Sequence, residues 1–241
     1  MDNHNQIPSI IDDFKPHLAE LRSRLLKALI SLSVAIVISF TIANRLIEIL
    51  TRPIGGTQRL QSIEVTENVG VFMRVSLLSG FTLSFPIVLY QILAFVLPGL
   101  NEKEKRWLKL LMPLATFLFL GGVIFAYFVM LPAALPFLIG FAGIQTIPRP
   151  MNYINFVTSL LFWIGIGFEM PLVIFVMAKL GLVTAGSLAR QWRVAIVLIA
   201  ILAAVITPTI DPVNMGLLML PLISLYLFSI LLALFARPPK K

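Results

Sequence analysis

The sequence contains no cysteine, only two histidines and few charged residues, which make up 12% of the chain. Without cysteine, disulfides, thiolate metal sites and cysteine nucleophiles are excluded. Both histidines, His4 and His17, lie near the N-terminus, and the sequence has no nucleotide-binding loop, HExxH or GxSxG pattern. Soluble domains carry about 25% charged residues. These absences argue against an enzyme and predict neither a metal nor a cofactor.

Hydrophobic residues are abundant instead, at 59% of the chain. The apolar runs are long and show no strand-like alternation, so they predict helices. A helix of ~20 residues crosses the hydrocarbon layer with every backbone polar group hydrogen-bonded within the helix. We therefore predict an all-α integral membrane protein, a single domain over residues 1–241, since no polar stretch is long enough to form a separate soluble domain. The six predicted spans cover residues 25–50, 71–97, 108–131, 154–178, 194–207 and 215–235.

The positive charges are unevenly distributed between the two sides of the predicted spans. The segment before the first span, the links 98–107 and 179–193 with their adjacent span ends, and the C-terminal tail carry 14 of the 19 lysines and arginines. Because such residues favour the cytoplasmic side, both termini are predicted to be cytoplasmic or stromal. The net charge of +8 then reflects orientation and anionic lipid headgroups, and it does not indicate nucleic-acid binding.

The other side is expected to carry two longer links, residues 51–70 and 132–153. Four prolines predict a structured but non-helical cap over 132–153. The last link on this side, 208–212, reads as a tight turn. The fifth span has 14 residues, about 21 Å, so either it thins the bilayer locally or Trp192 and Pro208 extend it.

One acidic residue, Glu169, lies inside the fourth predicted span. A carboxylate at this depth costs roughly 2.5–3.5 kcal/mol on insertion scales and usually faces a bundle interior or a wet cavity. Pro171 follows two residues later and removes the backbone donor for the carbonyl of Gly167, so a polar notch is predicted beside the acid. Three interpretations stay open: a hydrogen-bonded acid that joins helices, a contact site for a partner helix, and the proton or cation site of a secondary transporter.

Two further acids, Glu20 and Glu104, lie on the predicted cytoplasmic side. Leucines with helical spacing predict an amphipathic surface helix that begins near Pro16, in which Glu20 can pair with Arg24. Glu104 stands three residues after Asn101, as in a capping box. The alternative is that the two carboxylates together bind a pair of arginines, since guanidinium groups bind carboxylates through two parallel hydrogen bonds.

Several motifs together resemble the TatC family, the multi-span subunit of the twin-arginine protein translocase. They occur in order along almost the whole chain. They are His17-Leu-Ala-Glu20-Leu-Arg22-Ser-Arg24-Leu25, Pro53, Ser84-Phe-Pro86-Ile-Val-Leu-Tyr90-Gln91, Ala94-Phe95-Val-Leu-Pro98-Gly-Leu100, Phe125-Ala126-Tyr127-Phe128, Gly167-Phe168-Glu169-Met-Pro171 and Thr207-Pro208 with Asp211.

The resemblance implies six helices in a concave, glove-like arrangement and no chemical reaction. It implies a receptor that recognises twin-arginine signal peptides of folded cargo, that assembles with single-span TatA- and TatB-type subunits and with further copies of itself, and that is driven by the proton-motive force. The implied location is the cytoplasmic membrane, or a thylakoid membrane, which the spelling of two motifs weakly favours.

The resemblance also assigns roles to individual residues. An additional acid, Glu102, leaves open whether Glu102 or Glu104 contacts arginine. The implied signal-peptide residues are Glu20, Arg22, Leu25, Phe95 and Glu104; Glu169 with Pro171 is the implied partner site; Pro53, Tyr127 and Asp211 are further matched positions.

Overall fold

The computed structural model describes residues 10–96, 102–140, 146–206 and 212–236. Every regular element in these ranges is a helix. The elements are α1 (Ile10–Thr51), η1 (Arg52–Ile54), η2 (Thr57–Arg59), α2 (Glu67–Val96), α3 (Glu102–Phe125), η4 (Ala126–Met130), α4 (Leu131–Gly140), α5 (Pro150–Gly167), α6 (Met170–Lys179), α7 (Ala185–Arg190), α8 (Trp192–Ile206) and α9 (Pro212–Phe235).

Helix α1 is a single uninterrupted helix of 42 residues. The predicted start near Pro16 is wrong, because the helix begins six residues earlier, at Ile10. The amphipathic segment and the first span are therefore continuous. Pro16 is the seventh residue of this helix, so it removes one backbone donor beyond the first turn without ending the helix.

The third span is longer than predicted. Helix α3 continues through η4, a single stretch of π-helix, into α4, and together they give an apolar helical segment from Leu111 to Gly140. The expected non-helical cap over 132–153 is therefore wrong for residues 132–140 and, because α5 begins at Pro150, also for residues 150–153. Prolines are tolerated in such helices because neighbouring helices and local π-turns accommodate the freed backbone groups.

The fourth span is interrupted. Helix α5 ends at Gly167, and α6 begins at Met170, although the two together form one apolar segment of 30 residues. The predicted continuous helix over 154–178 is wrong at Phe168 and Glu169. Both residues still have helical φ and ψ, and Pro171 in the first turn of α6 withholds a donor from the preceding turn.

The last two spans are a short and a long helix. Helix α8 has 15 residues, about 22 Å, and α9 has 24. The link between them, which includes Asp211 and most of the predicted tight turn, lies outside the described residues, as does Asn101 of the predicted capping box. Five of the predicted spans correspond to segments long and apolar enough to cross a membrane, and the fifth prediction, residues 194–207, corresponds to the shorter apolar helix α8.

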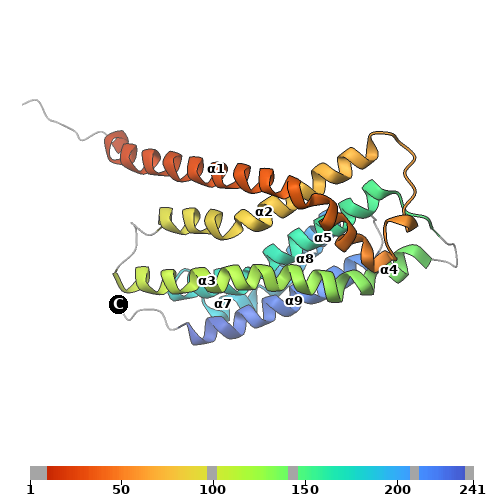
Figure 1. Cartoon of the computed structure of the whole chain (residues 1–241). Helices are drawn as coiled ribbons and strands as arrows, with labels where there is room; N and C mark the ends of the chain where they lie inside the picture. The colour runs from red at the N-terminus through yellow and green to blue at the C-terminus, as the bar shows by residue number, and fades with distance from the viewer. Residues whose placement is uncertain (1–9, 97–101, 141–145, 207–211, 237–241) are drawn as a thin grey trace, which may run out of the picture.

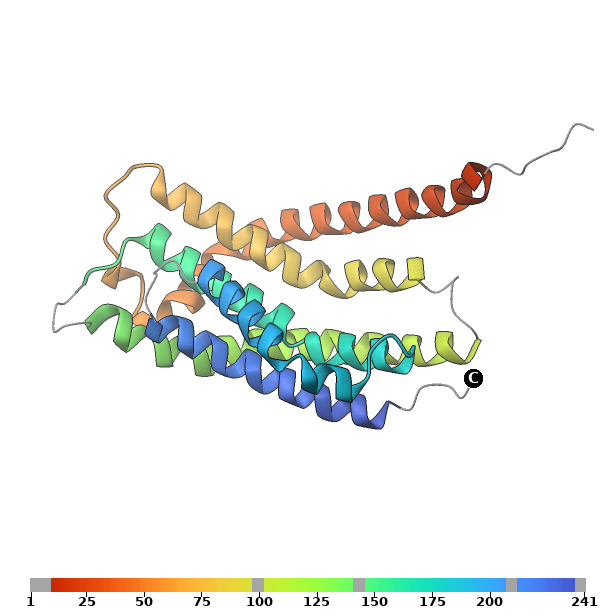
Figure 2. The same cartoon turned by 180° about the vertical axis from the view of Figure 1, so that it is seen from behind.

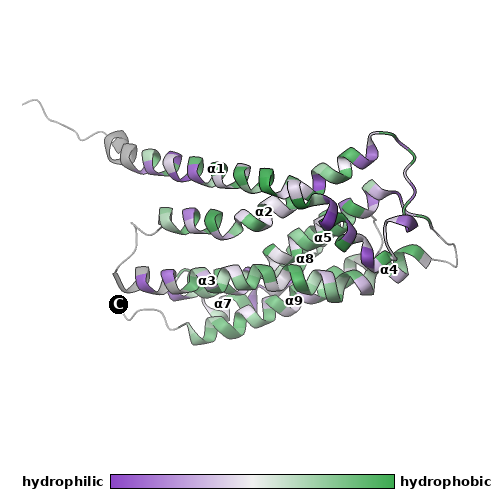
Figure 3. Ribbon diagram, in the orientation of Figure 1, coloured by the Kyte–Doolittle hydropathy of each residue, from purple (hydrophilic) through white to green (hydrophobic). Residues whose placement is uncertain are grey.

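The long helices run side by side, and the start of α1 lies at the same end of the molecule as the end of α9 (Figure 1). Seen from both sides, α1 diverges from α3 and α9 toward that end (Figures 1 and 2). The opposite end carries the segment 52–66 and residues 146–149, which we call the cap. Hydrophilic residues gather on the cap and at the other end, and the helices between them are mainly hydrophobic (Figure 3).

Small residues allow the helices to approach closely. A Cβ added at Gly80 of α2 would lie 2.7 Å from the Cα of Ile36 in α1. A Cβ at Gly122 of α3 would lie 2.9 Å from the Cα of Gly165 in α5. Between membrane helices this backbone contact replaces the hydrophobic driving force that drives packing in water.

Candidate functional site

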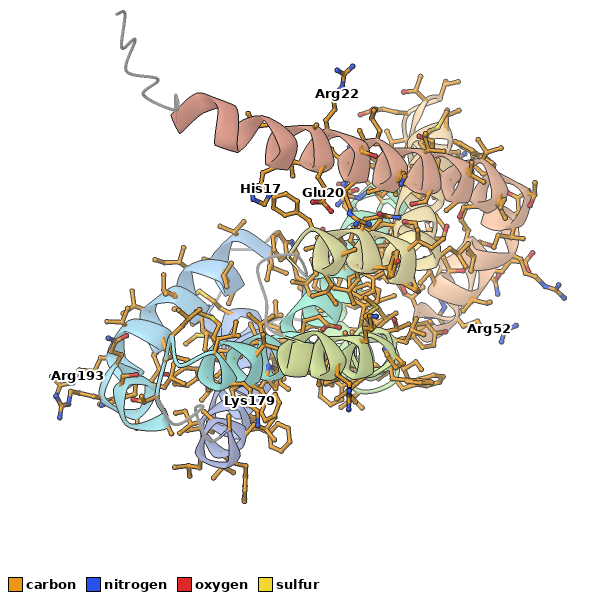
Figure 4. All side chains as sticks on the ribbon, turned by 90° about the vertical axis from the view of Figure 1, so that its left-hand side faces the viewer. His17, Glu20, Arg22, Arg52, Lys179 and Arg193 are labelled. Carbon is orange, nitrogen blue, oxygen red and sulfur yellow. The ribbon has the colours of Figure 1, made fainter. Side chains whose placement is uncertain are left out.

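Glu20 lies two to three turns into α1, on the side of this helix that faces the other helices, and Arg22 points the opposite way (Figure 4). Within the described residues, its partner is Arg24, whose Nη2 and Nε donate to the same oxygen, Oε1, over 3.0 and 3.3 Å. The side chain of Glu20 is 28% exposed. An i,i+4 ion pair at such a partly exposed site contributes about 0.3–0.5 kcal/mol, so a ligand can displace Arg24 at little cost.

The other predicted signal-peptide residues belong to three helices, α1, α2 and α3. Leu25 is exposed on α1, and Phe95 is half-buried near the end of α2. Arg22 is exposed and points away from Glu20, so it does not share one surface with the acid (Figure 4). Glu104 belongs to the first turn of α3, but its side chain is outside the described residues.

Glu169 lies at the interruption between α5 and α6. It precedes the first residue of α6, and its carbonyl accepts the backbone N–H of Val173 over 3.0 Å. Its Oε1 is buried and has no hydrogen-bond partner among the described residues. An unpaired buried polar atom is costly, and native structures contain few of them, so a hydrogen-bond donor for this oxygen is expected.

The residues around Glu169 are packed tightly on two sides. The Phe168 ring lies against Gly122 of α3, where an added Cβ would be 2.8 Å from the ring. On the other side, a Cβ at Gly167 would be 2.6 Å from Leu222 of α9. The interruption is therefore held between α3 and α9, which fixes the position of the Glu169 backbone. Pro171 is buried, which agrees with a rigid break and not a flexible hinge.

Pro53 and Tyr127 both affect one backbone carbonyl near the end of α1, that of Ile49. Pro53 has no N–H to donate to the carbonyl of Ile49, four residues earlier. The Tyr127 hydroxyl from η4 donates to that carbonyl over 2.7 Å. A second tyrosine, Tyr153 of α5, donates to the next carbonyl, that of Leu50, over 2.8 Å. Two of the matched positions thus belong to one structural unit, in which side chains of other helices complete the end of α1.

The sequence reading did not single out a buried acid at the cap, Glu67, whose side chain is 1% exposed. Its Oε1 accepts the backbone N–H of Met151 over 3.0 Å at the start of α5. Its Oε2 accepts the N–H of Ile63 over 3.3 Å and lies 3.4 Å from Nη2 of Arg149. The same Nη2 is 2.8 Å from Glu64, and these two carboxylates raise the pKa of Arg149. This network joins the segment before α2 to the start of α5.

The family profile described as "Sec-independent protein translocase protein (TatC)" matches residues 16–221. The chain belongs to the TatC family. The TatC protein of Deinococcus radiodurans is 38% identical over 226 residues, which cover 90% of this chain and 84% of that protein. The chloroplastic TATC of Arabidopsis thaliana is 34% identical, and the match covers 88% of this chain and 63% of that protein.

The fold agrees with a solved TatC. A crystal structure of the twin-arginine translocase receptor TatC superposes with a TM-score of 0.83 at 35% identity, and the match covers 91% of this chain and 99% of that one. The predicted all-helical membrane fold is thereby confirmed. This member of the family is a membrane-embedded translocase subunit and not an enzyme, and nothing supports the alternative of a secondary transporter. The chloroplastic relative is consistent with a thylakoid location as well as with the cytoplasmic membrane.

Proposed function

We propose that this protein binds the paired arginines of twin-arginine signal peptides through Glu20 and Glu104. Glu20 supports the proposal most directly, because its carboxylate faces the helix bundle and has only a weak internal partner. Guanidinium groups of a peptide can bind this carboxylate through two parallel hydrogen bonds, which an i,i+4 neighbour on the same helix does not achieve here. Arg24 then leaves Oε1 to the incoming arginine.

The second half of the proposal concerns the partners. The buried, unpaired Oε1 of Glu169 is proposed to accept a hydrogen bond from a polar side chain of a single-span TatA- or TatB-type helix. Inside a bilayer such a bond contributes about 0.6–2 kcal/mol, enough to select a partner but not to bind it permanently. Further copies of the same chain are proposed to join the assembly through other surfaces.

The experiment is peptide capture by the purified protein in nanodiscs. The double substitution Glu20→Gln and Glu104→Gln is expected to weaken binding of a labelled peptide with a paired-arginine motif by ten-fold or more, since each bond to a charged group contributes roughly 1.5–3 kcal/mol. Binding by the parent protein should weaken as salt rises, because partly exposed charges are screened. Glu48→Gln is the matched control, since Glu48 is an exposed acid of the same helix, near its opposite end.

Two results would contradict the assignment. One is equal binding by the double variant and the Glu48→Gln control. The other is an unchanged preference for arginine over lysine: the double variant still binds the two-arginine peptide tightly and binds a two-lysine peptide as weakly as the parent protein does. Glu169→Ala, which removes the acceptor, tests the partner site separately: it should reduce co-purification of a single-span subunit and leave peptide capture unchanged.

A further inference from the structure

Arg74 is a charged residue inside the second apolar helix that neither the family motifs nor the proposed function uses. It lies seven residues after Glu67, the start of α2, which places its Cα about 10 Å along the helix from the cap end. Charged side chains at such positions are costly and normally pair with an opposite charge or reach the interface. Within the described residues, Arg74 has no carboxylate partner, because the nearest acid of its helix, Glu67, is bound by Arg149 and by backbone N–H groups.

The Arg74 side chain is fixed against the neighbouring helix. Its Nε donates to the Thr158 hydroxyl over 3.2 Å, and its Nη2 donates to the Ser159 hydroxyl over 3.1 Å, both on α5. These two bonds hold the guanidinium between α2 and α5 and leave several of its five N–H donors without a protein acceptor in the described part of the chain. The positive charge is oriented but not neutralised.

A pocket of about 290 Å³ opens beside this guanidinium. The polar part of its wall consists of Arg74, Thr158 and Ser159, and the remainder is apolar and includes Leu77, Phe81 and Trp163. Helices α2 and α5 both run away from the cap, and the apolar residues follow the polar ones along each helix by three to seven positions. The pocket is therefore polar toward the cap and apolar toward the middle of the membrane.

We propose that this pocket binds an anionic phospholipid from the leaflet on the cap side. Its phosphate accepts hydrogen bonds from Arg74, and the upper part of one acyl chain lies against Leu77, Phe81 and Trp163. The order of polar and apolar walls matches the order of headgroup and chain in that leaflet. One guanidinium with apolar walls beyond it complements a phosphate and the acyl chain attached to it, which favours a lipid over a partner helix.

The pocket contains a tryptophan, which allows a direct test. In a variant with Trp107→Phe and Trp192→Phe, Trp163 is the remaining tryptophan of the three in the sequence. This variant is reconstituted into lipid vesicles in which bromine is attached to the acyl chains of one lipid, either phosphatidylglycerol or phosphatidylcholine. We expect stronger quenching of Trp163 by brominated phosphatidylglycerol. The preference should fall about ten-fold on adding Arg74→Gln, the loss expected for one charged hydrogen bond.

Two further variants and the addition of inorganic phosphate complete the test. Arg74→Lys keeps the charge without the planar fork and should retain part of the preference. Arg52→Gln should retain all of it, because Arg52 is an exposed arginine at the cap end of α1 and points away from the helices (Figure 4). Equal quenching by the two lipids, or an unchanged preference in Arg74→Gln, would overturn the proposal. Either result would favour an ion pair between Arg74 and a carboxylate of another protein. Loss of the preference on adding inorganic phosphate would overturn it in favour of a free anion.

Discussion

The hydroxyl of Tyr127 lies 2.7 Å from the carbonyl oxygen of Ile49. Ile49 precedes Pro53 by four residues, so this carbonyl lacks the i+4 backbone donor of an α-helix. The tyrosine supplies the missing donor from a different span. Pro53 ends the first helix, and Tyr127 connects that end to the π-helical stretch of the third span.

Tyr127→Phe is expected to destabilise the protein because it leaves the Ile49 carbonyl without this donor. The expected loss is about 1–3 kcal/mol in the free energy of unfolding, the cost of a buried unsatisfied polar group. It can be measured by denaturant unfolding in detergent micelles. Tyr90→Phe is the control, since Tyr90 is exposed and its substitution should change stability by less than about 0.5 kcal/mol.

The link between Pro53 and Tyr127 can be tested separately by a double-mutant cycle. Pro53→Ala restores a backbone N–H that can donate to the Ile49 carbonyl. In that background, Tyr127→Phe should cost less than it does in the parent protein, with a coupling energy of at least about 0.5 kcal/mol. Additive effects would show that the tyrosine acts independently of the proline.

The close crossing of α3 and α5 predicts opposite effects for two adjacent glycines. Gly122→Ala places a Cβ 2.8 Å from the Phe168 ring and 2.9 Å from the Gly165 backbone, so the helices must separate. A loss of about 1–3 kcal/mol is expected from such overpacking. Gly121→Ala meets nothing within 4 Å and should raise stability by up to about 1 kcal/mol, because alanine is the better helix former. Thermal unfolding followed by circular dichroism distinguishes the two, and equal effects would show that the crossing is loose.

Gly122→Ala should also affect the partner site, because the added Cβ pushes against Phe168, which directly precedes Glu169. If the partner site depends on a fixed backbone at the interruption, Gly122→Ala should reduce co-purification of a single-span subunit, and Gly121→Ala should not. Normal partner binding in a destabilised Gly122→Ala protein would show that the position of Glu169 tolerates movement.

Helix α8 predicts a local effect on the membrane. Its 15 residues span about 22 Å, well below the ~30 Å of an average hydrocarbon layer. The bilayer is expected to be thinner beside Val205, an exposed residue of this helix, than beside Val37, an exposed residue of α1. Spin-labelled lipids can measure the thickness at the two positions. Equal thickness at the two positions would mean that the segment around Trp192 or residues beyond 206 lengthen the span.

The sequence predicted the number and approximate position of the spans well, because apolar runs of fixed length have few alternative structures. It was less reliable where proline decided the boundary. Pro16 and Pro132 suggested a helix start and a helix end, yet both lie inside helical segments. Pro171 does accompany a break, at Phe168 and Glu169, two to three residues before it. Sequence spacing does not distinguish these cases, since neighbouring helices determine whether the freed backbone groups are accommodated.

The candidate site was predictable only where a single residue was unusual in its own stretch of sequence. Glu169 was identified because an acid in an apolar run is rare. Glu67 and Arg74 were missed as site residues, because their importance depends on contacts with residues more than 80 positions away, namely Met151, Arg149 and Thr158. No periodic pattern in one sequence reports such pairings.

Glu67→Gln is expected to loosen the cap, because the buried carboxylate accepts the Met151 and Ile63 N–H groups and faces Arg149. An amide presents a single oxygen and places an NH₂ group against one set of donors, so at least one bond is lost, at about 1–3 kcal/mol. The most direct measurement is the rate of trypsin cleavage after Arg59, which should rise several-fold, since cleavage follows local opening. Glu64→Gln serves as the control: Glu64 also contacts Arg149, but its side chain is 65% exposed, and its substitution should change the rate by less than two-fold, as for exposed ion pairs. A similar increase in both variants would assign the stability of the cap to the charge of Arg149 and not to the buried hydrogen bonds of Glu67.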